Sequence, residues 1–170
     1  MNVTFTRTGE RRYRVSVDGP RVISSWMEPA PGYDERLPHD MAHFVVENEL
    51  GLDGGIFGQL ASGGTAGTFQ PVDVETRRKV VKKGIKILDA NRDDAALSEK
   101  VVHLACSTWK NELDFAGAAK GAASTEDIKK ICCQFDAVSA VWAKLDVGES
   151  MTLIWRSSLA SAGRRSQKRR

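Results

Sequence analysis

Residues 1–19 read MNVTFTRTGERRYRVSVDG, and the alternation of apolar and polar side chains in this stretch decides the first part of the fold. Apolar residues recur at every second position on both sides of a T-G-E turn: Val3, Phe5, Tyr13, Val15 and Val17. Successive side chains of a strand point to opposite faces, so this pattern predicts two antiparallel strands with one buried face. A third short strand is expected over residues 22–26, beyond the break formed by Asp-Gly-Pro at residues 18–20.

The rest of the chain predicts several helices and one more strand. Helical spacing of apolar residues indicates helices over about residues 38–50, 54–60, 73–88, 93–113 and from Ser124 onward. SMTLIW, at residues 150–155, alternates as a closing strand. We therefore expect an α+β fold: a small antiparallel sheet of three N-terminal strands plus one C-terminal strand, packed against about four to five helices. The alternative is a mostly helical domain with a separate N-terminal hairpin.

The distribution of charge separates a globular domain from a basic tail. Of the last seven residues, RRSQKRR, five are basic, and removing these charges from the formal net charge of +3 leaves −2 for the rest. We expect one globular domain over residues 1–158 and a basic, disordered tail over residues 159–170. Such a tail could contact nucleic acid or another polyanion weakly, through charge alone.

Membrane and disulfide patterns are absent from the sequence. No apolar run approaches the roughly 20 residues that a membrane span requires, and the N-terminus lacks the apolar segment of a signal peptide. The three cysteines, Cys106, Cys132 and Cys133, form a poor disulfide framework because two of them are adjacent. These features predict a cytoplasmic protein without membrane contact.

Residues 37–47, LPHDMAHFVVE, carry the strongest chemical signal. On a helix, His39, Asp40, His43 and Glu47 fall on one narrow face. Two histidines at positions i and i+4 can bind one metal ion, the spacing used in HExxH zinc sites, and either acid can add an oxygen ligand. The sequence predicts that these four residues form a site for a zinc-like divalent metal ion. Hydrolase-like chemistry would suit such a site, although no residue is assigned a catalytic role.

Other interpretations of this helix remain open. Its polar face could be ordinary solvated surface, with Asp40 complementing the helix dipole and Glu47 exposed to water. Alternatively, the face could dock a partner, which would make the protein an interaction module and not an enzyme. A pocket at the start of the helix, reached by the glycine-rich loop at residues 62–68, would favour the metal site, whereas a flat exposed face would favour docking.

Two resemblances accompany this motif. LPHDMAHFVVENELGL, followed by GIFGQLASGGTAGTF, resembles a group of uncharacterised bacterial proteins with an LPHDxxHFVVE-type core, whose activity is unassigned. His39-Asp40-xx-His43 is more distantly similar to the HDxxH zinc motif of a coenzyme Q biosynthesis protein family. In that family a glutamate twelve residues after the second histidine completes the site, and here Gly55 occupies that position. Glu47 or Glu49 would have to replace it.

Two further patterns carry weaker signals. His103 and Cys106, at positions i and i+3, could form a pair of ligands for one metal ion. A place beside or within a core helix face is the simpler expectation. The loop SGGTAGT at residues 62–68 lacks the G-K-[ST] ending of a phosphate-binding loop, so we expect a mobile segment that could cover a site near the first helix.

Overall fold

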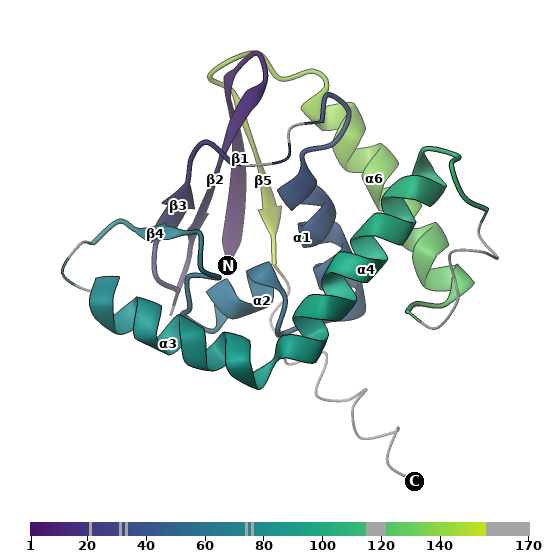
Figure 1. Ribbon diagram of the computed structural model, residues 1–170. Coiled ribbons are helices and arrows are strands. Elements are labelled where there is room, and N and C mark those ends of the chain that lie inside the picture. Colours follow the sequence, from purple (N-terminus) through teal and green to yellow (C-terminus); the bar gives the residue numbers. More distant parts are fainter. Residues whose placement is uncertain are drawn as a thin grey trace, which may run out of the picture.

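The computed structural model describes residues 1–20, 22–30, 32, 34–73, 75, 77–114 and 122–155. Within them the chain forms one antiparallel sheet with helices packed against it, which confirms the predicted α+β class (Figure 1). The strand order is β4-β3-β2-β1-β5. The strands are β1 (Asn2–Gly9), β2 (Arg12–Asp18), β3 (Ser25–Met27), β4 (Gln70–Pro71) and β5 (Ser150–Ile154).

The two long strands pair in the register that the alternation predicts. Val3 lies opposite Val17, and Phe5 lies opposite Val15, so the buried side chains of β1 and β2 share one face. The closing strand β5 pairs with β1 at one edge of the sheet, as expected.

The other edge differs from the prediction. The third strand begins at Ser25, later than expected, and the two-residue strand β4 beside it was not predicted. Pro71 explains why β4 is short, since proline has no N–H to donate to a neighbouring strand.

Five helices occur in the described ranges: α1 (His39–Leu50), α2 (Ile56–Ala61), α3 (Arg77–Ala90), α4 (Arg92–Trp109) and α6 (Thr125–Trp142). Ser124 caps α6, since its hydroxyl accepts a hydrogen bond from the backbone N–H of Asp127 and the Asp127 carboxylate accepts one from the backbone N–H of Ser124. None of the described helices is long and apolar enough to cross a membrane. The predicted tail at residues 159–170 lies outside the described residues.

The helix α1 is the centre of the core and lies between the sheet and the helices α4 and α6 (Figure 1). Phe44 of α1 contacts the ring of Phe5 from β1, and it also meets Phe57 of α2 and Trp155 after β5. The N-terminal hairpin therefore shares one core with the helices and does not stand apart as the alternative fold required. Every side chain of α1 from Asp40 to Glu47 is buried. Apart from His39, which is exposed, the polar face of this helix is thus internal.

Candidate metal centre

The two histidines of α1 meet at the first turns of the helix. The Nε2 atoms of His39 and His43 lie 3.2 Å apart, and the two rings are nearly perpendicular. Gly32 makes room for this arrangement: it has a φ of +71°, and a Cβ there would lie only 2.7 Å from Cβ of His39. The predicted i, i+4 pair is therefore brought together.

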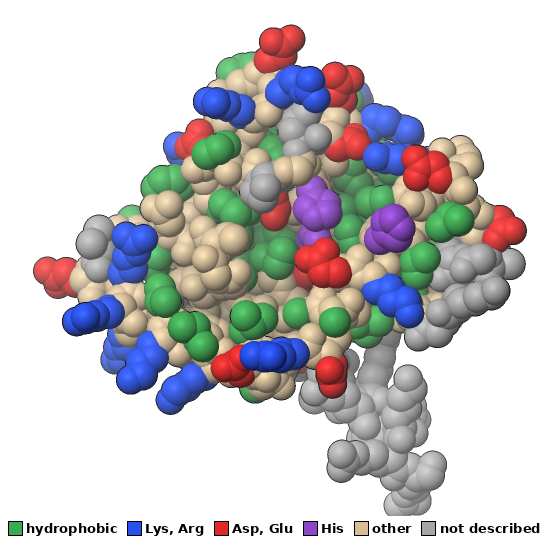
Figure 2. Space-filling model, in the orientation of Figure 1, with side chains coloured by type: hydrophobic (Ala, Val, Ile, Leu, Met, Phe, Trp, Pro, Cys, Tyr) green, Lys and Arg blue, Asp and Glu red, His purple; other side chains and the backbone are tan. Residues whose placement is uncertain are grey.

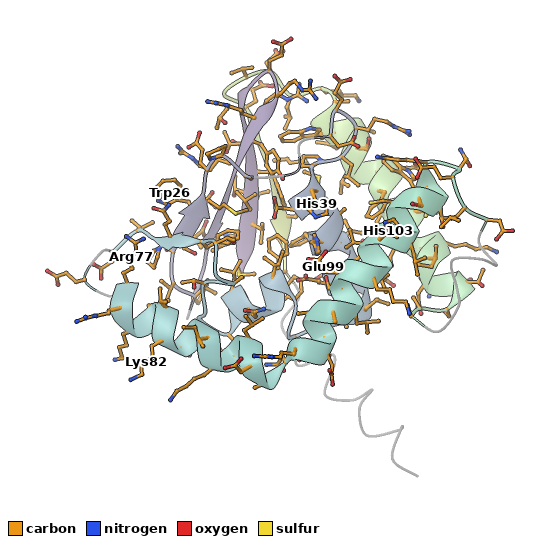
Figure 3. All side chains as sticks on the ribbon, viewed as in Figure 1. Trp26, His39, Arg77, Lys82, Glu99 and His103 are labelled. Atoms are coloured by element: carbon orange, nitrogen blue, oxygen red, sulfur yellow. The ribbon has the colours of Figure 1, made fainter. Side chains whose placement is uncertain are left out.

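A third group comes from a different helix. Glu99 of α4 places Oε2 3.6 Å from Nε2 of His43. Ligand atoms of His39, His43 and Glu99 all lie within 4.8 Å of one another. Figure 3 shows His39 above Glu99, where α1 faces α4. Glu99 was not predicted, since in the sequence it looks like any acid on a helix and nothing local ties it to the HDxxH segment.

These separations fit one small cation. Two ligands of a tetrahedral zinc ion, each about 2.0–2.1 Å from the metal, lie roughly 3.3–3.4 Å apart. The observed distances from His43 are 3.2 Å to His39 and 3.6 Å to Glu99. Because the Glu99 side chain is 68% exposed, it can adjust to a bound ion without disturbing the core.

Glu47, a predicted ligand, is used differently. It is fully buried, and its two carboxylate oxygens accept hydrogen bonds from the backbone N–H groups of Ile56 and Phe57, at 2.9 and 2.8 Å. The carboxylate thereby satisfies the first N–H groups of α2, which have no partner within the helix. A Cβ at Gly55 would lie 2.2 Å from Cδ of Glu47. The absence of a side chain at Gly55 therefore leaves room for Glu47.

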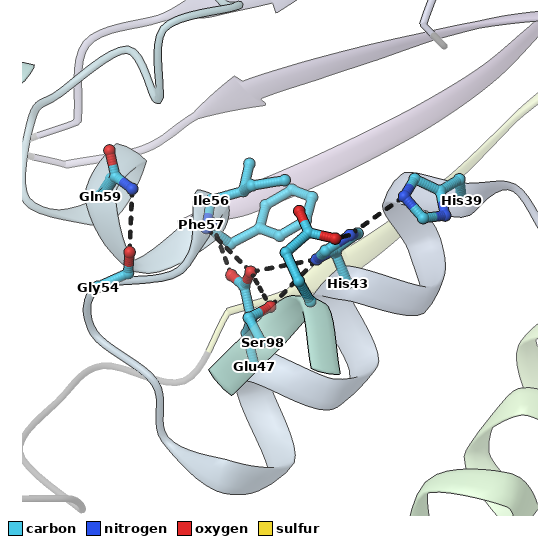
Figure 4. Close-up of polar contacts among 9 residues, drawn as sticks. His39, His43, Glu47, Gly54, Ile56, Phe57, Gln59 and Ser98 are labelled. Atoms are coloured by element: carbon cyan, nitrogen blue, oxygen red, sulfur yellow. Dashed lines mark hydrogen bonds and ion pairs between the residues drawn. The ribbon is translucent and has the colours of Figure 1, made fainter. Parts of the chain in front are cut away.

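Ser98 connects Glu47 to His43 (Figure 4). The Ser98 hydroxyl donates to Oε1 of Glu47 at 2.8 Å, and its oxygen lies 3.1 Å from Nδ1 of His43. With its hydrogen given to Glu47, the Ser98 oxygen accepts from His43 Nδ1–H. A neutral imidazole carries one N–H, so this contact leaves Nε2 of His43 with its lone pair facing His39 and Glu99. Neutral His43 is thus held in the tautomer that binds metal.

Asp40, the other predicted acid, is held by the sheet. Its Oδ2 atom accepts a hydrogen bond of 2.5 Å from the hydroxyl of Tyr13 on β2, and both residues are buried. Burial raises the pKa of Asp40, while the Tyr13 hydrogen bond and the two histidines partly offset this. Burial and the neighbouring Asp40 raise the pKa of Tyr13 as well. Asp40 and Glu47 therefore lie outside the three-residue cluster, and the buried Glu47 is not the solvated charge that the surface interpretation expected.

The two histidines have pKa shifts of opposite sign. Burial lowers the pKa of His43, but the Glu47 carboxylate, with Oε1 3.6 Å from Nδ1, and the charges of Glu99 and Asp40 raise it by more. The net shift is therefore upward from 6.5. Burial and the neighbouring His43 lower the pKa of His39, and Asp40 and Glu99 offset only part of this. His39 is thus the more readily neutral of the pair.

The cluster borders a cavity of about 450 Å³. Its lining includes all four predicted residues of α1 together with Ser98 and Glu99 of α4, and Ala66 and Thr68 come from the glycine-rich loop. Figure 2 shows a hollow beside the histidine and the acidic side chain at the centre of this face. The expected proximity of this loop to the first helix is therefore observed.

The weaker pair, His103 and Cys106, lies on the other side of the cluster. Both residues line a second cavity of about 400 Å³, which His39 and Glu99 also border. Burial raises the pKa of the Cys106 thiol to about 11, so the thiolate that a metal would need is disfavoured. His103 is exposed and is not part of the three-residue cluster (Figure 3).

Comparison with protein-family models, curated proteins and solved structures finds no match to this chain.

Proposed function

We propose that this protein binds one zinc-like divalent ion through His39, His43 and Glu99 and uses it for hydrolase-like chemistry. The observation that carries the proposal is the position of Nε2 of His43, 3.2 Å from Nε2 of His39 and 3.6 Å from Oε2 of Glu99, close to the spacing of neighbouring ligands on a tetrahedral ion. All three ligand atoms lie within 4.8 Å of one another. Two imidazoles and one carboxylate form a mixed nitrogen and oxygen set, which suits zinc.

The supporting contacts are those of a tuned metal site. Metal-binding histidines commonly donate their second N–H to an oxygen that fixes the ring, and such partners strengthen binding. Here the oxygen is that of Ser98, which is itself fixed by the buried Glu47. Glu47 belongs to the proposed site as a positioning residue and not as a ligand.

Hydrolysis is favoured over a purely structural role by the openness of the site. Three protein ligands leave one tetrahedral position for water, and zinc lowers the pKa of bound water to about 7. The cavity beside the cluster could admit a substrate to that position. Asp40, which also lines the cavity, is the buried carboxyl group proposed as general base.

The interaction-module hypothesis gains less support. It needs the polar side chains of α1 on an accessible face, whereas Asp40, His43 and Glu47 are at most 3% exposed. Of the four polar residues of this face only His39 is exposed, so the face offers a small ligand a cavity and does not offer a protein partner a continuous polar surface.

Metal analysis with matched histidine variants tests the proposal. Protein purified without a histidine tag and loaded with zinc should retain about one ion per chain. The His43→Ala variant should retain none, and His103→Ala should match the wild type because His103 lies outside the cluster. Equal zinc content in all three proteins would refute the site. If the site binds zinc, a panel of esters, phosphoesters and amides then tests hydrolysis, with Asp40→Asn expected to lose turnover but keep zinc.

A further inference from the structure

The helix α3 carries an excess of positive charge that the described structure leaves unneutralised. Its sequence, RRKVVKKGIKILDA, contains six basic residues and one acid. All six basic side chains are exposed: Arg77, Arg78, Lys79, Lys82, Lys83 and Lys86. The single acid, Asp89, pairs with Arg92 of α4 at 2.8 Å. Among the described residues, no ion pair engages any of the six.

Exposed apolar side chains gather on the same helix. Of the eight large hydrophobic residues exposed in the described ranges, three lie on α3 and a fourth, Val72, comes shortly before it. Val81, Ile85 and Leu88 are spaced i, i+4 and i+7, so they form one stripe along the helix, and they are 40–57% exposed. Apolar side chains gathered in this way mark a contact surface more often than scattered ones do.

The basic and apolar stripes lie side by side. Lys79, Lys82 and Lys86 are spaced i, i+3 and i+7 and form a second stripe, about a third of a turn from the apolar one. The remaining side of the helix packs on the protein: Val80 and Gly84 are buried, and Gly84 lies against the glycine-rich loop. In Figure 2 blue side chains line the lower left rim, where Figure 1 places α3. We call these two exposed stripes the α3 surface.

The chemistry of the α3 surface discriminates among occupants. A second copy of the chain would bring two strongly basic helices together, which charge repulsion opposes. Nucleic acid would neutralise the lysines but would leave the apolar stripe without a contact, and α3 has no aromatic residue on which a base could stack. A lipid surface with anionic headgroups suits both stripes at once, since lysines meet phosphates and aliphatic side chains enter the acyl boundary.

We propose that α3 docks this protein on the surface of an anionic lipid bilayer. The helix lies in the plane of the interface, with Val81 and Ile85 inserted and Lys82 and Lys86 at headgroup level. This proposal departs from the expectation of no membrane contact, which rested on the lack of a spanning segment and of a signal peptide. Leu88, at the end of the apolar stripe, also lines the cavity of the candidate metal centre, but the proposal does not require bound metal.

Vesicle co-sedimentation of the full chain at low salt tests the docking. The protein should bind vesicles of phosphatidylcholine with phosphatidylglycerol and should not bind phosphatidylcholine alone. Lys82→Gln/Lys86→Gln should lower the partition coefficient roughly 20- to 30-fold, since each lysine near an anionic surface contributes about fivefold. Its matched control, Lys100→Gln/Lys144→Gln, removes two exposed lysines outside α3 and should have little effect.

A second variant pair tests the apolar stripe. Val81→Gln/Ile85→Gln should lower partitioning roughly 10-fold, whereas Val141→Gln/Val147→Gln, two other exposed valines, should not. Circular dichroism should show all variants folded, because every substituted side chain is exposed. Equal binding to neutral vesicles, equal loss in the control variants, or binding unchanged in both α3 variants would overturn the proposal. So would binding to duplex DNA that depends on the lysines but not on Val81 and Ile85, with no vesicle binding.

Discussion

The hydroxyl oxygen of Ser98 lies 3.1 Å from Nδ1 of His43, and the other ring nitrogen of His43 faces His39 and Glu99. Ser98 comes from α4 and His43 from α1, so the packing of two helices sets the orientation of the imidazole. The same hydroxyl donates to the buried Glu47. The first prediction concerns this link.

Ser98→Ala should lower zinc affinity 10- to 100-fold, because His43 loses the partner that fixes its tautomer and ring plane. The measurement is competition against a zinc-binding dye. Ser107→Ala is the control, since Ser107 is also a buried serine of α4 but lies outside the cavity. Wild-type affinity in Ser98→Ala would show that the hydroxyl has no part in metal binding.

Glu99→Gln should lower zinc affinity without lowering stability, whereas Glu47→Gln should lower the stability of the metal-free protein. Glu99 is exposed, so Glu99→Gln should weaken zinc binding and leave the unfolding free energy of the metal-free protein within about 0.5 kcal/mol. Glu47→Gln places an amide N–H₂ among buried donors and should cost about 3 kcal/mol in the metal-free protein. Urea unfolding and zinc titration of both variants separate the roles. Large destabilisation by Glu99→Gln would contradict its assignment as a ligand.

Gly55→Ala should destabilise the fold by about 1–3 kcal/mol, because a Cβ there would overlap the Glu47 carboxylate. Thermal unfolding measures the effect. In the control variant Gly9→Ala, the added Cβ would lie no closer than 3.5 Å to its nearest neighbour, the flexible Arg12 side chain. A stable Gly55→Ala protein with normal zinc affinity would show that Glu47 can move without consequence.

The stability of the protein should depend on pH in opposite directions with and without metal. The folded-state pKa of His43 is raised above 6.5, so its stabilisation is fully present below 6.5 and is lost as pH rises through the higher folded pKa. Zinc needs neutral His43, so the gain in melting temperature on adding zinc should increase over the same range.

The pKa of His39 is shifted downward, so His39 also contributes to the pH dependence of the wild type. The quantity to measure is therefore the difference in melting temperature between the wild type and the His43→Ala variant. Without metal, that difference should shrink from pH 6 to pH 8 in differential scanning calorimetry, and with zinc it should grow. If this difference changed with pH in the same direction with and without zinc, His43 could not be the group that titrates in the metal-free protein and binds zinc when it is added.

Removal of residues 149–170 should unfold the protein, whereas removal of residues 163–170 should not. The longer deletion takes away β5, which pairs with β1, and Trp155, whose ring contacts Phe44 and Phe57. Circular dichroism and urea unfolding of both truncated chains check this. Equal stability of the two would mean that β5 contributes nothing to the sheet.

The sequence by itself determined whatever depends on local periodicity. Alternation over residues 1–19 determined the pairing of β1 and β2, and the four-residue spacing of His39 and His43 placed their rings on one side of a helix turn. Helix geometry fixes such neighbours whatever the rest of the chain does. For this reason the α+β class and two of the three residues of the candidate cluster could be predicted.

Only the tertiary structure decided which polar groups join the candidate cluster and which make other contacts. A helical wheel gives the angle of a side chain about its axis but not what lies opposite it. Asp40 and Glu47 share the face of the histidines, yet Tyr13 holds one and the start of α2 holds the other. Glu99 and Ser98 reach His43 because α4 packs on α1, and that contact depends on the whole core and not on any local run of residues.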